Sequence, residues 1–491
     1  MRACLKMKRY LPFAAVCFFS TPALCLAAEP VRSMQPPGWD AGLKLQTALD
    51  TNADPRVVEI NLEARLASVE IVPGHPTEAW TYDGGLPGPL IRARVGDRLV
   101  VHFVNHLPQP TTVHWHGVRV PIQMDGVPEI SQPEVKPGES FTYDFVVPDA
   151  GLFWYHPHVM SAAQVGFGLY GALLVEDPSE QIGVADELVL VLSDIEISPR
   201  GNLEPADSGG VAGMVFGREG NHVLVNGRER PVLKARAGAT QRWRIVNTAK
   251  SRYFSIDAGD STTYTLIGGD GGLQEYPTRT DLIVLGPGER ADVIVTPHAK
   301  PGSDVVVRSL LFDRGYGSTE YRDVPDLFTM TMAAEPAVEA PPLPAIHRTI
   351  EPLTRAGATD VPIRLTLTQR NRTSEFGIDG RAYPNAPHVA AAPGETQLWT
   401  VVNQTKWAHP LHLHGFFFQV LDEKGEPIRP LAWKDTVHVP AERTVRLLVR
   451  FDDREGEWMY HCHILDHADG GLMSTVLLGG VKPSAHTHSR R

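Results

Sequence analysis

Residues 96–105, GDRLVVHFVN, decide the fold, because the same pattern returns twice further along the chain. Gly238 leads to Asn247 and Gly394 to Asn403, and each Gly-to-Asn step is nine residues long. An Asp-Gly or Asn-Gly turn precedes each copy, and a Pro-Gly-Glu or Pro-Ala-Glu triplet follows it. Two markers kept in order through three copies, with starts at 96, 238 and 394, predict three similar domains.

The apolar runs around these copies are short and are bounded by Gly, Pro, Asn or Asp, as is typical of strands joined by turns. The chain lacks a convincing long segment with a helical period, so we expect an all-β protein made of sandwiches. A Pro/Ala-rich linker is predicted at 333–346, between copies two and three. The predicted strands lie at 57–62, 99–105, 140–147, 187–192, 242–247, 291–295, 363–367, 397–403 and 444–449.

Length and charge agree with this division. The chain has 491 residues, and domains of about 100–200 residues make three a natural number. The formal net charge is −11, which argues against nucleic acid or an anionic membrane surface as a partner.

The N-terminal residues have the layout of an export signal. Basic residues at 6, 8 and 9 precede a mostly apolar run over 11–24, and small residues follow at 27 and 28. We predict a signal peptide at 1–28, a periplasmic protein and no membrane span in the mature chain, with the export route left open. Removal of 1–28 takes away three of the four cysteines and leaves Cys462 alone, so a disulfide scaffold is excluded.

Histidine pairs occupy one fixed place in the repeat. Nine residues after the repeated Asn, the first and third copies read HWHG (114–117) and HLHG (412–415), whereas the middle copy reads IDAG (256–259). Second pairs follow at HPH (156–158) and HCH (461–463). Residues i and i+2 of a strand share a face, so each pair presents two imidazoles side by side. Four such pairs predict a multinuclear metal site at a domain interface, although imidazole alone suits copper, zinc, iron or nickel.

Cys462 indicates which metal. In a strand its thiolate points away from the face that carries His461 and His463, so it serves a separate centre, with His409 and His467 as partners. Two imidazoles and a thiolate in a trigonal site describe electron-transfer copper. An isolated buried cysteine is more often inert, but this one stands between two histidines with a third five residues later.

These residues together resemble a known family. The motifs at 114–117, 156–158, 409–415 (HPLHLHG) and 461–467 (HCHILDH), with 83–97 (DGGLPGPLIRARVGD), resemble those of three-domain multicopper oxidases. That family includes laccases, ascorbate oxidase, bilirubin oxidase and bacterial cuprous oxidases. The resemblance implies three consecutive cupredoxin-like Greek-key β-sandwich domains at 50–178, 185–334 and 345–480, then a flexible tail at 481–491. The first and third would carry ligands, and the second would be a spacer without copper ligands.

The resemblance also implies four copper ions. His114 and His412 would bind the type 2 ion, and His409, Cys462 and His467 the type 1 ion. The type 3 pair would take His116, His156, His158, His414, His461 and His463.

The axial position of the type 1 site falls on Leu472, which cannot coordinate, so we expect a three-coordinate site of raised potential. Met473 is one residue further and points to the opposite face of a strand.

The implied reaction is that of the family. A small reducing substrate donates single electrons through His409 or His467, Cys462 passes them to its neighbours His461 and His463, and dioxygen is reduced to water. Asp125, eleven residues after His114, matches an acid near the type 2 ion and is expected to relay protons.

A second acid, which many bacterial relatives carry six residues after the cysteine, is replaced here by Ala468. Strand direction argues against Asp466 or Asp469 as its substitute.

The sequence favours a laccase-like oxidase of phenols or aromatic amines, acting as a monomer. The methionines are scattered instead of forming a rich insert, which argues mildly against a dedicated cuprous oxidase. Two alternatives stay open: a metallo-oxidase acting on Cu(I) or Mn(II) in copper tolerance, and a non-enzymatic periplasmic copper-binding or envelope-assembly protein.

Overall fold

The computed structural model describes residues 43–484 apart from 73, 181, 183, 185, 316–323, 337–347 and 371–372. The predicted signal peptide at 1–28, residues 485–491 of the predicted tail and most of the predicted linker therefore lie outside the described residues. Strands dominate the part of the chain that is described, and all nine predicted strand segments coincide with observed strands, with 140–147 extending one residue past the end of its strand.

Domain 1 is a sandwich of two four-stranded sheets, with orders β2-β1-β4-β6 and β3-β8-β7-β5. Leu62, Phe103 and Trp115 lie in the core between the sheets. Its strands are β1 (Val57–Val72), β2 (His75–Tyr82), β3 (Ile91–Arg94), β4 (Arg98–Asn105), β5 (His114–His116), β6 (Ser140–Val146), β7 (Gly151–His156) and β8 (Gly171–Glu176). β1 is longer than predicted because Val69 and Ile71 near its end pack with Val189 and Leu224 of domain 2.

Domain 2 has a six-stranded sheet, β10-β9-β12-β17-β14-β15, and a five-stranded sheet, β11-β19-β18-β13-β16. Trp243, Phe254 and Phe328 pack between them. The strands are β9 (Asp186–Ile195), β10 (His222–Val225), β11 (Val232–Ala235), β12 (Gln241–Asn247), β13 (Phe254–Asp257), β14 (Thr262–Gly269), β15 (Gly272–Thr280), β16 (Ile283–Leu285), β17 (Arg290–Pro297), β18 (Asp304–Leu310) and β19 (Asp326–Met332).

Domain 3 pairs two five-stranded sheets, β21-β20-β23-β27-β25 and β22-β29-β28-β24-β26. Its core contains Phe376, Trp399 and Trp458, and Cys462 lies in the same cluster. The strands are β20 (Thr359–Arg370), β21 (Thr373–Ile378), β22 (Val389–Ala391), β23 (Thr396–Asn403), β24 (His409–Leu413), β25 (Phe418–Leu421), β26 (Thr436–Val439), β27 (Thr444–Arg450), β28 (Gly456–Cys462) and β29 (Met473–Leu478).

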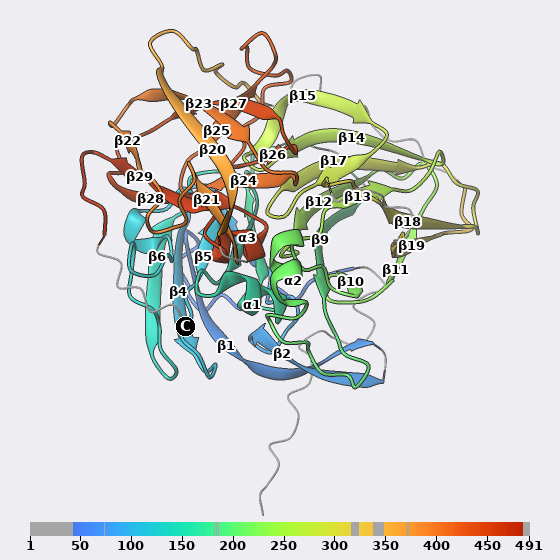
Figure 1. The fold of residues 1–491 in the computed structure, drawn as a ribbon. Coiled ribbons are helices and arrows are strands. Elements are labelled where there is room, and N and C mark those ends of the chain that lie inside the picture. Colours follow the sequence, from blue (N-terminus) through green and yellow to red (C-terminus); the bar gives the residue numbers. More distant parts are fainter. Residues whose placement is uncertain are drawn as a thin grey trace, which may run out of the picture. The chain divides into compact units, whose positions relative to one another are not determined.

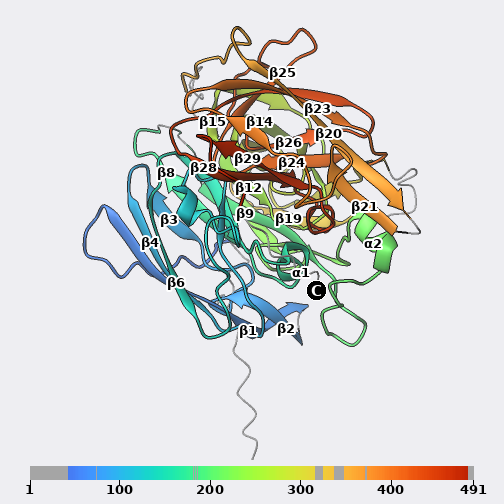
Figure 2. The same cartoon turned by 60° about the vertical axis from the view of Figure 1, so that its left-hand side comes forward.

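Within the described residues each domain also contributes one short α-helix, and the three lie where the domains join (Figures 1 and 2). These helices are α1 (Ser161–Gly166), α2 (Gly210–Phe216) and α3 (Leu465–Asp469), and α3 contacts both others. The 3₁₀ turn η2 (Ile122–Met124) is shorter still. Helices of five to seven residues complete too few turns to leave a helical period in the sequence, which is why none was predicted.

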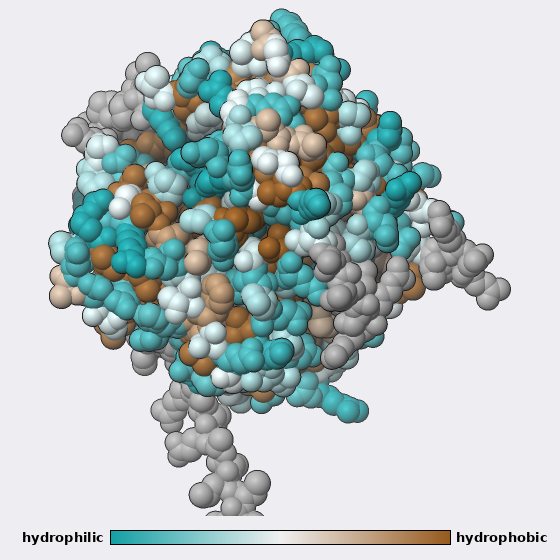
Figure 3. Space-filling model, turned by 90° about the vertical axis from the view of Figure 1, so that its left-hand side faces the viewer, coloured by the Kyte–Doolittle hydropathy of each residue, from teal (hydrophilic) through white to brown (hydrophobic). Residues whose placement is uncertain are grey.

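Among the described residues, no helix combines the length and apolar character that crossing a bilayer requires. The face drawn in Figure 3 mixes small hydrophobic groups with more numerous hydrophilic residues.

The repeated asparagine has the same structural role in all three domains. Asn105, Asn247 and Asn403 end β4, β12 and β23, and each is at most 2 % exposed. In every copy the side-chain amide donates to one backbone carbonyl four or five residues ahead and to another 30 to 38 residues ahead, and its oxygen accepts the N–H two residues ahead. The repeat therefore marks a hydrogen-bonded turn that connects the two sheets of each sandwich.

We predict that Asn105→Ala destabilises the protein by about 2–4 kcal/mol, because the buried Val135 carbonyl and Leu107 N–H lose their partner, as does the carbonyl of the exposed Gln109. The side chain donates to Gln109 O and Val135 O at 2.8 Å and accepts from Leu107 N at 2.9 Å. Thermal and denaturant unfolding measure the loss. The exposed Asn202→Ala is the control and should change stability by less than about 0.5 kcal/mol. Equal effects from the two substitutions would contradict this role.

Candidate metal centres

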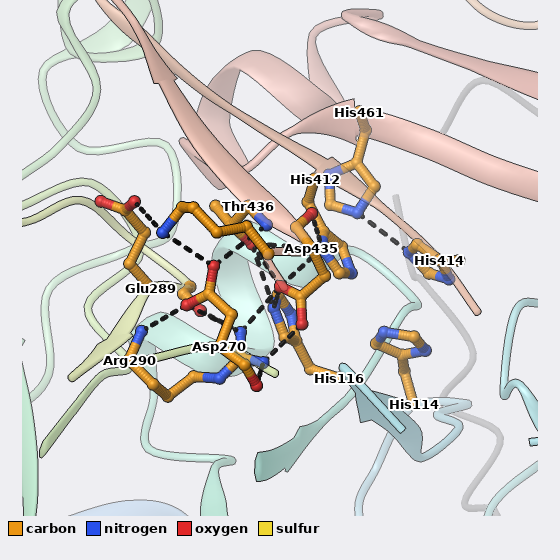
Figure 4. Close-up of polar contacts among 12 residues, drawn as sticks. His114, His116, Asp270, Glu289, Arg290, His412, His414, Asp435, Thr436 and His461 are labelled. Atoms are coloured by element: carbon orange, nitrogen blue, oxygen red, sulfur yellow. Dashed lines mark hydrogen bonds and ion pairs between the residues drawn. The ribbon is translucent and has the colours of Figure 1, made fainter. Parts of the chain in front are cut away.

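Eight of the predicted ligand histidines lie together between domains 1 and 3. Seven are at most 1 % exposed, and His158 is partly buried. Rings from the two domains stack directly, with centroids 3.9 Å apart for His114 and His414 and 3.7 Å apart for His116 and His412. Figure 4 shows the histidines of domain 1 facing those of domain 3. The structure thus brings together all eight residues that the sequence assigned to the multinuclear site.

Strand register explains the convergence. His114 lies opposite His156 in the β5–β7 ladder, and His412 lies opposite His461 in the β24–β28 ladder. Side chains directly opposite in an antiparallel pair share a face, so each ladder presents histidines of two motifs together.

The prediction that every HxH pair lies within a strand is wrong for three of the four pairs. β7 ends at His156, β24 at Leu413 and β28 at Cys462, so the second histidine of each pair follows the strand end. In the first case Pro157 has no N–H with which to continue a ladder. In the others, single backbone bonds from His414 N to Met459 O and from His463 N to Pro410 O hold the residue in place.

Four of the eight rings are held at one nitrogen and have no partner at the other. Nδ1 of His114, His156 and His412 donates to backbone carbonyls at 2.7–3.0 Å. His116 is held at Nε2 instead, by Asp435. The buried ring nitrogens left without a hydrogen-bond partner are Nε2 of His114, His156, His158 and His412, Nδ1 of His116 and both nitrogens of His463.

These orphaned nitrogens fit a metal site. Burial lowers the pKa of His461 to about 3 and lowers the pKa of His116 and His156 well below the ordinary value, so the rings are neutral. A neutral imidazole with a free, inward-facing lone pair is a metal ligand, and buried polar atoms are rarely left unpaired otherwise. The all-imidazole donor set suits copper.

The predicted three-residue site is also assembled. Nδ1 of His409 lies 3.3 Å from Cys462 Sγ, Nδ1 of His467 lies 3.7 Å from it, and all three residues are fully buried. Burial raises the pKa of the Cys462 thiol, and the Ile464 N–H donates to the sulfur at 3.4 Å. A thiolate in this apolar core needs a cation beside it, and two neutral imidazoles with a thiolate are the ligands of electron-transfer copper.

Leu472 and Met473 lie on opposite sides of the chain, as the strand-face argument from the sequence predicted. Leu472 is fully buried in the domain 3 core, and its carbonyl accepts the Cys462 N–H at 3.0 Å. Met473 lies opposite His461 in the β28–β29 ladder and so shares the face of His461, away from Cys462.

The outer edge of the three-residue site is covered by domain 2. His467 Nε2 donates to the Val215 carbonyl of α2 at 3.0 Å, and His409 Nε2 lies 2.7 Å from Thr405 Oγ1. Met214 of α2 packs against the domain 3 core. The description of domain 2 as a spacer is therefore too narrow, although no side chain of domain 2 belongs to the groups of possible ligands found in residues 43–484 as described.

Asp125 lies within the eight-histidine cluster, as the sequence predicted. Its backbone carbonyl accepts from His114 Nδ1 at 2.7 Å, and its Oδ2 accepts from His414 Nδ1 at 2.8 Å. Burial alone would raise the pKa of this carboxyl, but His414 and His114 hold it well below its ordinary value. Oδ1 is buried and has no hydrogen-bond partner.

The segment around Ala468 is a helix and not the strand that was assumed, and the hydrogen bonds of its two acids go to domains 1 and 2 instead of to a histidine of the cluster. Asp466 accepts from Arg218 and Ser251 of domain 2. Asp469 accepts from the Ala162 N–H of α1 at 2.9 Å.

Several residues at the site could not be found from the sequence. Asp435 and Thr436 contact His116 and His412, and Arg290 of domain 2 contacts Asp435. A lone Asp, Thr or Arg has no spacing pattern that marks it as part of a site.

We predict that Cys462→Ser removes one metal ion per chain and the intense thiolate–copper absorption of the copper-loaded protein, because the three-residue site loses its sulfur. The eight-histidine cluster should keep its metal. Metal analysis and an absorption spectrum measure both effects. A double His486→Ala/His488→Ala variant of the C-terminal residues is the control and should leave both unchanged. Persistence of the intense band in Cys462→Ser would contradict the assignment.

Comparison with known proteins agrees with this geometry. Sequence profiles described as multicopper oxidase match residues 64–180, 186–316 and 358–479. The chain is 32 % identical to the multicopper oxidase MmcO of Mycobacterium tuberculosis, over 86 % of this chain and 87 % of that protein. It is 27 % identical to a laccase of Bacillus subtilis, over 81 % and 90 %.

Among solved structures, a multicopper oxidase from Campylobacter jejuni, described as a metallo-oxidase, superposes with a TM-score of 0.78 at 27 % identity. The match covers 88 % of this chain and 94 % of that one. The likeness confirms that the three sandwiches are cupredoxin-like domains. The chain accordingly belongs to the multicopper oxidase family, whose members are oxidoreductases that use copper and dioxygen.

Proposed function

We propose that the protein is a laccase-like oxidase that couples four one-electron oxidations of phenols or aromatic amines to the reduction of dioxygen to water. The observation that carries this proposal is the three-residue segment His461–Cys462–His463, which has its thiol in one candidate centre and both imidazoles in the other. When bound, copper supplies the one-electron transfers and the reduction of dioxygen. We further propose four ions, divided into one type 1, one type 2 and a type 3 pair.

The residues of the three-residue site form the place that receives electrons from the reducing substrate. His409 and His467 hold their inner nitrogens toward Cys462, while Thr405 and Val215 fix the outer nitrogens. The ring orientation is thus set before a metal binds, which limits structural change when an electron arrives. Leu472 is fully buried in the same apolar cluster as Cys462.

The residues of the larger site exclude bulk water and orient the rings. Carbonyl acceptors at Nδ1 of His114, His156 and His412 direct Nε2 toward the shared space. Asp125 lies among them as a buried carboxylate with one oxygen that has no hydrogen-bond partner. We assign Asp125 the role of holding and delivering protons while oxygen is reduced.

A second candidate function, oxidation of Cu(I), is favoured by one observation. Met214 of α2 packs beside the helix that carries His467, and a Cβ on Gly470 would lie 3.1 Å from its sulfur. A thioether selects Cu(I). The similar structure from Campylobacter jejuni is described as a metallo-oxidase.

Oxygen uptake by the copper-loaded protein with a phenol, Cu(I) or Mn(II) tests these alternatives. We expect uptake with the phenol, and equal rates for wild type and Met214→Leu, which conserves volume. If Cu(I) is the donor, Met214→Leu should raise KM for Cu(I) several-fold, whereas the control Met332→Leu in the domain 2 core should not. Absence of uptake with every donor would favour a copper-binding or envelope-assembly protein.

We propose in addition that the mature protein is exported to the periplasm after removal of residues 1–28 and that it acts as a monomer. The layout of the N-terminal sequence supports export.

We predict that Asp125→Asn slows turnover roughly a hundredfold, because a positioned proton donor contributes at least that much, while copper content stays unchanged. Oxygen uptake and metal analysis measure the two quantities. The control is Asp97→Asn, a buried acid of domain 1 that accepts from the backbone N–H of Arg94 and pairs with the Arg56 side chain instead of a histidine. Unchanged turnover in Asp125→Asn would refute the proton role, and loss of copper would assign the residue to holding the ligands.

A further inference from the structure

Domain 2 reaches the eight-histidine cluster although it supplies none of the predicted ligands. Gly288, just before β17, has φ +85°, and a Cβ added there would lie 2.9 Å from the His463 ring and 3.1 Å from that of His116. Only a glycine lets the backbone approach these two rings so closely. The chain of domain 2 is thus inserted between a ligand of domain 1 and a ligand of domain 3.

Two residues later, Arg290 bonds to all three domains. Its side chain is fully buried. Nε donates to the Leu152 carbonyl of domain 1 at 3.1 Å, and Nη2 donates to the Asp270 carbonyl of domain 2 at 2.8 Å. Nη1 donates to Asp435 Oδ1 of domain 3 at 2.7 Å, and Nη2 bonds to Oδ2 of the same carboxylate. Figure 4 shows this fork against the carboxylate.

Asp435 in turn contacts one ligand from each outer domain. Its Oδ1 accepts from His116 Nε2 at 3.2 Å, and its backbone carbonyl accepts from His412 Nδ1 at 3.0 Å. Thr436 donates to Oδ1 at 2.8 Å, and its hydroxyl lies 3.3 Å from His116 Nε2 and 3.2 Å from His412 Nδ1. One short segment of domain 3 therefore orients rings on both sides of the interface.

The contact from Asp435 sets the tautomer of His116. Both carboxylate oxygens face the guanidinium of Arg290, so the carboxylate acts as an acceptor and the imidazole proton is on Nε2. The lone pair is then on Nδ1, which is buried and has no partner. His114, His156 and His412 have the opposite arrangement, with Nδ1 held and Nε2 free. The His116 ring can offer a lone pair to a metal in the cluster only in this reversed tautomer.

We infer that Arg290 and Asp435 are positioning residues of the multinuclear site, with Arg290 of domain 2 aiming the Asp435 carboxylate that fixes His116 and, through its backbone, His412. The inference rests on the proposed function only in treating the eight-histidine cluster as the copper site. Assembly of that site then depends on the docking of domain 2, because Arg290 belongs to domain 2 whereas Asp435 belongs to domain 3.

The test compares two buried arginines of domain 2. Arg290→Met removes the fork from Asp435. Arg242→Met is the matched control, because Arg242 donates to both oxygens of Asp292 at 2.9 and 2.6 Å and its side chain is only 4 % exposed. Each variant removes the two-pronged arginine contact of one buried carboxylate, Asp435 in the first case and Asp292, which keeps Arg244 at 3.4 Å, in the second. Both should therefore lower the melting temperature of the copper-free protein.

Only Arg290→Met should change the copper of the cluster. We expect its affinity for the cluster ions to fall about tenfold or more, with an altered electron paramagnetic resonance signal from those ions. The thiolate–copper absorption at Cys462 and KM for the reducing substrate should be unchanged, while kcat falls. Arg242→Met should keep the copper content, the resonance signal and kcat of the wild type.

If Arg290→Met does not yield folded protein, two more conservative variants still test the inference. Arg290→Lys retains the charge but not the fork, and Asp435→Asn retains an acceptor for His116 but not the charge. Both should shift the resonance signal, and Asp435→Asn should retain more copper than Asp435→Ala. If every one of these variants gives the wild-type signal and copper content, the pair does not position the ligands and the inference is wrong. Failure of the wild type to oxidise any donor would instead overturn the proposed function, since copper content and the resonance signal do not depend on the donor.

Discussion

The structure depends on one constraint: it buries imidazole nitrogens that have no hydrogen-bond partner in the protein. Seven ring nitrogens of the eight-histidine cluster are buried and have no hydrogen-bond partner. Each such atom costs roughly 1–3 kcal/mol in the metal-free protein, and copper coordination offsets that cost. Because domains 1 and 3 supply four rings each, metal binding would also help to hold these two domains together.

The two candidate centres are placed relative to each other by the simplest property of a strand. Adjacent residues point to opposite faces, so Cys462 turns toward His409 and His467 while His461 turns toward His414 and His412. His461 Nδ1 also donates to the Cys462 carbonyl at 2.9 Å, which fixes the ring against the backbone of the cysteine. A route between the centres thus needs only the covalent chain and no further residue.

The sequence was sufficient for the parts of the protein that repeat. The asparagines at 105, 247 and 403 and the first histidine pair of each outer domain occur at constant offsets, and constant offsets become equivalent places in equivalent sandwiches. Sequence patterns could not identify residues or elements that belong to no repeat. α2, which covers His467, is too short to leave a period, and Asp435 and Arg290 meet only through tertiary packing. The strand ends at His156, Leu413 and Cys462 were also missed, because the second histidine of each pair is held by single bonds that have no sequence pattern.

The middle domain shows how one repeat position acquires different uses. At the places where the outer domains have histidines, domain 2 has Ile256 and Ala258, and both are buried in its own core. Gly138 of domain 1 and Gly288 of domain 2 occupy the same place in the Pro-Gly-Glu marker, yet a Cβ on Gly138 would meet open space and one on Gly288 would meet two histidine rings. Domain 2 therefore contributes to the site through the backbone and the arginine beyond this marker, and the same sandwich that supplies ligands in the outer domains holds them in position in the middle one.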